Sequence, residues 1–107
     1  MSLERKMIKY AKKRDKIEKQ IAKYKEIICS LQREINSLEL EAKDWEAKGL
    51  ENLEVCSNYE TCKLMLGTAT DTLKKVENKL DKKVYEFNML DKTLDDWQQR
   101  LEEQKEL

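Results

Sequence analysis

The sequence contains two long rows of apolar residues that recur at alternating spacings of three and four. The first row runs from Leu3 to Trp45 and is apolar at twelve of thirteen positions, and the second runs from Val55 to Leu101 and is apolar at thirteen of fourteen. The other 80 residues include only 17 apolar ones. A stripe this narrow and this long is typical of helices that pair through a coiled-coil seam. In heptad letters, position a falls every seventh residue over 7–42 and 59–101, and position d every seventh residue over 3–45 and 55–97.

Composition supports helices and limits the chemistry that this chain can perform. Charged residues make up 41% of the sequence, which has two glycines and no proline, so turn-rich β folds are disfavoured. The absence of histidine excludes imidazole catalysis and histidine-containing metal sites. The sequence has no glycine-rich phosphate loop and no metal-ligand spacing. We therefore expect no enzyme activity, no catalytic or metal-binding residues, no cofactor and no small-molecule substrate.

The two rows are out of phase by three residues near position 50. Continuing the first row puts position d at Asn52, whereas the second row needs it at Val55. Either one continuous helix carries a stammer, or the chain reverses direction. Gly49 favours reversal, because glycine readily adopts the left-handed conformation that ends helices. The second helix then has two candidate starts, capped by Asn52 or by a capping box that begins at Ser57.

We therefore predict an all-α fold in a single coiled-coil domain, residues 1–107, built as a long antiparallel two-helix hairpin. The first helix is expected at about 2–48, the turn at about 49–53 and the second helix at about 54–106. Such hairpins are expected to pair into a four-helix bundle. The competing fold is a continuous helix in a parallel coiled-coil dimer. Gly67 leaves the heptad phase intact, so we expect the second helix to continue through it.

Antiparallel pairing brings a positions of one helix against d positions of the other, and two registers fit. In the longer register, Leu38 meets Leu66 and the polar seam residue Arg14 meets Leu90. The register shorter by one heptad places Arg14 directly against Lys83, the other polar seam residue. Because two like charges would then be buried together, we predict the longer register.

Arg14 and Lys83 therefore need an explanation of their own. Their long side chains either bind an acidic partner or lie along the seam while their charges reach water or the nearby Asp91 and Glu18. We favour the second interpretation, in which these residues set register and partner choice at some cost in stability.

Three cysteines, Cys29, Cys56 and Cys62, form no CxxC pair and no disulfide framework. We expect reduced thiols, with Cys62 in the core. No apolar run approaches the ~20 residues of a membrane span, and the charged N-terminal segment lacks the apolar stretch of a signal peptide. The expectation is therefore an intracellular, cytoplasmic protein without membrane contact.

Several apolar residues lie off the seam, where a lone hairpin would leave them in water. Widened apolar stripes on coiled-coil helices are typical of bundles with more than two helices. We therefore predict a protein partner, most simply a second copy in a homodimer. The candidate interaction surface comprises Ile27, Leu40, Leu50, Leu53, Leu64, Met65 and Val84.

The formal net charge of zero hides an uneven distribution. Residues 1–25 contain ten Lys or Arg and three acids, whereas residues 26–62 contain three basic residues and nine acids. The N-terminal lysines have few arginines among them, and we interpret them as surrounding the helix in solvent, which disfavours a nucleic-acid partner. These lysines are Lys6, Lys9, Lys12, Lys13, Lys16, Lys19 and Lys23.

The functional prediction is a structural, protein–protein interaction coiled-coil module that associates with itself or forms part of a larger assembly. One alternative is a small helical chaperone or cofactor that binds a client protein on its helix faces. Another is nucleic-acid contact through the basic N-terminal third, which salt-dependent binding would reveal. The sequence carries no motif that is diagnostic of one family.

Overall fold

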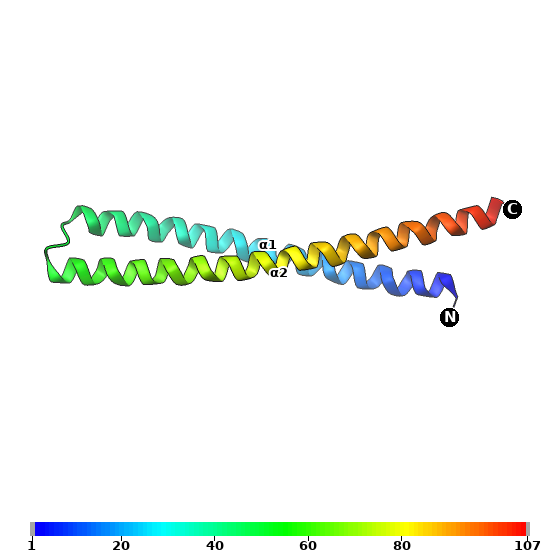
Figure 1. The fold of residues 1–107 in the computed structure, drawn as a ribbon, viewed down its shortest axis with the longest axis horizontal. Helices are drawn as coiled ribbons and strands as arrows, with labels where there is room; N and C mark the ends of the chain where they lie inside the picture. Colours follow the sequence, from blue (N-terminus) through cyan, green and yellow to red (C-terminus); the bar gives the residue numbers. More distant parts are fainter. Residues whose placement is uncertain (1, 107) are drawn as a thin grey trace. The chain divides into compact units, whose positions relative to one another are not determined.

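The computed structural model describes residues 2–106, except for the side chain of residue 106, and consists of two long helices. Helix α1 spans Leu3–Ala47 and helix α2 spans Leu53–Glu106, and residues 48–52 form the turn between them (Figure 1). No strand occurs in residues 2–106. The predicted all-α hairpin is confirmed, and the continuous helix is excluded by the break between α1 and α2.

The helices pair within two compact units. The terminal unit combines Met1–Tyr24 with Lys79–Leu107, and the turn unit is the single segment Lys25–Asn78. In each unit a segment of α1 packs against a segment of α2. The outermost residues of the predicted domain, 1 and 107, lie outside the described residues.

The apolar rows account for where the helices bury their side chains. Every one of the seam positions in both rows is buried or half-buried, and the polar residues between them are mostly exposed. Complete burial of a Leu or Ile side chain contributes about 1.5–3 kcal/mol, so the seam is the main source of stability. The six most buried side chains all belong to the seam: Ile17, Leu38, Ala42, Cys62, Ala69 and Leu94.

Gly49 lies in the turn that follows α1 and adopts the left-handed conformation, with φ of 96°. Its N–H donates to the carbonyl of Glu46 at 3.2 Å, and the N–H of Lys48 donates to the carbonyl of Trp45 at 3.1 Å. These short-range bonds satisfy carbonyls at the end of α1 that have no partner further along the helix. They also tighten the last turn, which explains why α1 ends at Ala47 and not at the predicted residue 48.

Asn52 caps the start of α2. Its side-chain oxygen accepts hydrogen bonds from the backbone N–H groups of Glu54 at 2.9 Å and Val55 at 3.4 Å. Its carbonyl accepts the first intrahelical bond, from the N–H of Cys56 at 2.8 Å. Of the two candidate starts, the structure therefore uses Asn52, and Ser57 lies inside α2.

Gly67 lies within α2, as predicted, and the helix continues through it. The hydroxyls of the threonines around it donate hydrogen bonds to backbone carbonyls four residues earlier. Thr68 donates to Leu64, Thr70 to Leu66, and Thr72 to Thr68, at 2.8–3.1 Å. Such bonds compete weakly with the helix without interrupting it.

The two glycines provide a matched test of the turn. We expect Gly49→Ala to lower the free energy of unfolding by about 1–2 kcal/mol, because the left-handed conformation is unfavourable for alanine. Gly67→Ala should instead raise it by about 0.5–1 kcal/mol, since the glycine is helical and a Cβ added there would meet no atom within 4 Å outside its own turn of helix. Urea unfolding followed by circular dichroism, at one protein concentration, measures both. A Gly49→Ala variant at least as stable as the wild type would contradict the turn.

Candidate interaction surface

Contacts across the seam in each unit agree with the longer register. In the terminal unit, the guanidinium of Arg14 lies 2.8 Å from the carboxylate of Asp91, next to the expected Leu90. Tyr10 and Trp97 also meet there, with ring centroids 4.9 Å apart. The shorter register would have placed Arg14 against Lys83.

In the turn unit, small side chains allow the helices to pack closely. Leu38, Ala42, Cys62 and Ala69 form one buried cluster. The thiol of Cys62 donates to the backbone carbonyl of Leu38 at 3.2 Å. This contact joins the backbone of α1 to a side chain of α2 directly, which a larger residue at position 62 would prevent.

Arg14 and Lys83 lie along the seam with their charged groups at its edge. Arg14 bonds Asp91, as the sequence suggested, whereas Lys83 pairs with Glu86 of its own helix at 3.5 Å and not with Glu18. Neither side chain is fully buried, so each charge is both paired and hydrated. The role of these residues in setting register and partner choice stays a prediction.

The Arg14–Asp91 pair yields a double-mutant test. Because its side chains are 31% and 46% exposed, Asp91→Ala should lower the free energy of unfolding by less than about 1 kcal/mol. Arg14→Leu should stabilise the hairpin, since leucine fits a seam position. In the Arg14→Leu background, Asp91→Ala should have no effect. Urea unfolding of the four chains measures this coupling, and an equal cost of Asp91→Ala in both backgrounds would show that the ion pair contributes nothing.

The apolar residues assigned to the candidate surface are mostly in water. Six of the seven are exposed, and Ile27 is half-buried beside the seam. Three more exposed apolar side chains are absent from the predicted surface, because they lie far from the turn: Ile8, Tyr85 and Met89. Tabulating every apolar residue outside the seam, and not only those near the turn, would have found them.

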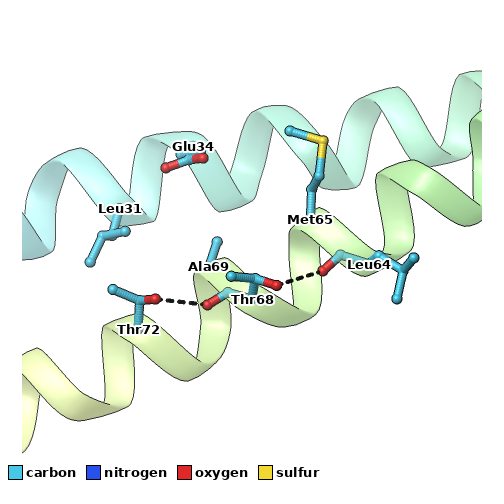
Figure 2. Close-up of a pocket in the computed structure, with 7 residues that line it drawn as sticks. All are labelled: Leu31, Glu34, Leu64, Met65, Thr68, Ala69 and Thr72. Atoms are coloured by element: carbon cyan, nitrogen blue, oxygen red, sulfur yellow. Dashed lines mark hydrogen bonds between the residues drawn. The ribbon is translucent and has the colours of Figure 1, made fainter.

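An open groove of about 330 Å³ collects part of this surface in the turn unit. Leu64 and Met65, which are 74% and 51% exposed, stand along one side. Leu31 and Glu34 of α1 also line this groove. Thr68, Ala69 and Thr72 of α2 complete the lining (Figure 2).

The groove requires few hydrogen bonds from whatever occupies it. The hydroxyls of Thr68 and Thr72 are already bonded to carbonyls of their own helix, as the dashed lines in Figure 2 indicate. Glu34 is the one charged residue in its lining. A second groove, in the terminal unit, includes the charged Arg14 and Asp95 as well as Ile8. The turn-unit groove is therefore the better site for an apolar contact.

The seam also defines two opposite sides of each unit. Glu34, Met65 and Thr72, all at position g, line the groove together with Thr68 at position c. Residues at position e from both helices, including Glu39 and Lys63, line a different groove of the turn unit. Positions c and g thus form one side of a unit, and positions b and e form the other.

This assignment corrects the expectation that the N-terminal lysines surround α1. All seven occupy positions c, f and g, and none occupies b or e. Positions b and e of α1 in the terminal unit are instead acidic or apolar: Glu4, Ile8, Ala11, Asp15, Glu18 and Ala22. The expectation was wrong because the lysines recur with nearly the same period as the helix, which gathers them on one side.

The c/g side of the terminal unit, here called the lysine face, carries eight basic and three acidic residues. The basic ones are Lys6, Lys9, Lys13, Lys16, Lys23, Lys79, Lys82 and Arg100. The c/g side of the turn unit, here called the acidic face, carries four acids and one lysine within its helices. These are Glu34, Glu41, Asp44 and Glu54, with Lys75.

The three cysteines are free thiols in different environments. Cys29 is exposed, Cys56 is half-buried and Cys62 is buried. Burial raises the pKa of the Cys62 thiol; Glu41 adds to the rise and Lys63 opposes it. In the part of the chain that the structure describes, no three His, Cys, Asp or Glu side chains are grouped as a metal site.

Thiol modification distinguishes these environments. At pH 8, Cys62 should react with a disulfide reagent at least about 100-fold more slowly than Cys29, since the thiolate is the reacting form and the native seam must open first. Urea should remove the difference. The slow phase should vanish in Cys62→Ala and persist in Cys29→Ala. Equal rates for both thiols in the folded wild type would contradict the burial of Cys62.

Comparison with family models, curated proteins and solved structures finds no match for this chain. Neither α1 nor α2 contains a stretch that is long and apolar enough to cross a membrane, within residues 2–106.

Proposed function

We propose that this chain is a structural coiled-coil module that pairs with a second copy of itself and acts through protein–protein contact. The observation that most supports this proposal is the groove of the turn unit, where Leu64 and Met65 are exposed beside small residues. Exposed apolar side chains that line a common groove are typical of protein interfaces. A second hairpin would cover them and complete a four-helix bundle.

The exposed area is sufficient for such an interface. The accessible surface is 8553 Å², about 2,300 Å² more than a compact monomer of this mass exposes. Stable interfaces bury about 1,200–2,000 Å² in total. Two helices side by side bury only one stripe each, so a second pair of helices supplies the missing cover.

A second copy is favoured over an unrelated client because a homodimer uses the same surface twice. The interaction is non-enzymatic, and three free thiols fit a reducing, intracellular compartment. Client binding by a monomer and nucleic-acid binding are outcomes that the experiments below distinguish from self-association.

Sedimentation equilibrium tests the proposal. We expect the wild type to approach twice the monomer mass at micromolar concentrations. Met65→Lys should raise the dissociation constant about tenfold or more, because it places a charge in the apolar groove. Ile8→Lys is the matched control: Ile8 is similarly exposed at 57%, but it lies at position b, on the other side of its unit.

The proposal would be overturned if the wild type stays monomeric up to about 100 μM, because its affinity for itself would then be weaker than the usual range for stable self-association. If Ile8→Lys dissociates the dimer and Met65→Lys leaves it intact, the groove of the turn unit is not the interface. Circular dichroism of both variants establishes that each hairpin is still folded.

A further inference from the structure

Resting on the proposed self-association, we infer that two copies pair in opposite directions, so that the lysine face of each copy docks on the acidic face of its partner. The terminal unit of one chain then covers the groove in the turn unit of the other. The contact occurs twice, related by a two-fold axis, and closes the dimer.

Charge is the first argument for this arrangement. Residues 1–24 and 79–107 together hold 15 basic and 11 acidic residues, whereas residues 25–78 hold 7 basic and 11 acidic. The opposite charges are concentrated on one side of each unit, as the lysine face and the acidic face. Pairing in the same direction would place eight basic residues against eight others, and four acids against four. Pairing in opposite directions places unlike charges together, which favours association and excludes the wrong orientation.

The shape and composition of the two faces supply the second argument. In the groove, Thr68, Ala69 and Thr72 are small, so that a helix of the partner can approach closely. The lysine face offers exposed Met89, at position c of α2, together with the aliphatic stems of its lysines. Such stems cover apolar surface while their ammonium groups reach carboxylates at the edge. Glu34, on the α1 side of the groove, is placed to receive one of them.

The composition of the lysine face argues against nucleic acid as its partner. It contains a single arginine, Arg100, and no aromatic residue on which a base would stack. The opposite b/e side of the terminal unit is acidic, with seven acids and one lysine within its helices. A second copy supplies acids at fixed positions together with an apolar groove, which a polyanion lacks.

Charge reversal tests the orientation. The first variant combines Lys6→Glu, Lys9→Glu, Lys13→Glu and Lys16→Glu, which leaves the lysine face with four basic and seven acidic residues. The second combines Glu34→Lys, Glu41→Lys and Asp44→Lys, which leaves the acidic face with four basic residues and one acid. The third variant carries all seven substitutions. All seven residues are exposed and lie off the seam, so each hairpin should still fold.

The matched control for the first variant combines Arg5→Glu, Lys12→Glu, Lys19→Glu and Lys92→Glu. These residues belong to the same unit and the substitutions change the charge by the same amount, but position f points directly away from the seam and lies outside the lysine face. Every variant is first examined by circular dichroism, and its dissociation constant is then measured by sedimentation equilibrium at 50 mM and 500 mM NaCl.

We expect the first and second variants each to raise the dissociation constant at least about tenfold at 50 mM NaCl, and an equimolar mixture of the two to recover wild-type affinity. The third variant should also recover, to within about threefold of the wild type, because its reversed faces again carry opposite charges. The control should stay within about threefold. High salt should weaken the wild type and the third variant alike.

The orientation is overturned if the wild type dimerises but the first variant pairs as well as the control, or if the third variant fails to recover. Those results leave the proposed self-association intact, whereas a monomeric wild type removes both. Binding of a 30-base-pair DNA duplex at 150 mM NaCl, lost in the first variant while its dimer mass is unchanged, would assign the lysine face to nucleic acid and also overturn the inference.

Discussion

The apolar seam is the interaction on which every other feature of this protein depends. It uses two positions in seven on each helix, so five positions in seven stay available for contact with solvent or a partner. A globular protein of this length would hide most of its apolar residues in a shared core. Here burial is confined to one line of side chains, and even that line contains Arg14 and Lys83. The surface of the hairpin is therefore large for its mass and is organised by the same heptads that form the seam.

The fold was predictable from the sequence because few other signals compete with the heptads. Both rows are buried or half-buried along their whole length, and the predicted ends of the helices lie within one residue of the observed ends. Gly49 could be assigned to the turn because its expected conformation matches the geometry of a helix end. The start of α2 was ambiguous, since Asn52 and Ser57 are both good caps locally. The choice between them depends on how short a turn can join the two helices, which no single residue encodes.

The surface was less predictable, for two physical reasons. The exposure of a side chain beside the seam depends on how much of it the other helix of the hairpin covers. Ile27 and Met65 both occupy position g, yet Ile27 is half-buried and Met65 is exposed. The number of lysines in a helix does not indicate which side they occupy, whereas their heptad positions do. Their positions show that charge, like hydrophobicity, follows the helical period here. The formal neutrality of the chain thus describes neither the lysine face nor the acidic face.

The five-residue turn and the two helices differ in their tolerance of changes in length. An insertion among residues 48–52 lengthens a loop whose ends are capped separately by Gly49 and Asn52. A single residue inserted within α1 rotates the side chains after it by about 100° about the helix axis, relative to those before it. The apolar stripe of one part of α1 then turns away from α2. A gain or loss of seven residues keeps the stripe in phase, but the two stripes stay fully paired only if the other helix changes by the same amount at the same level. Natural variation in the length of such a protein should therefore occur as a heptad gained or lost in both helices together, whereas the turn can gain or lose single residues.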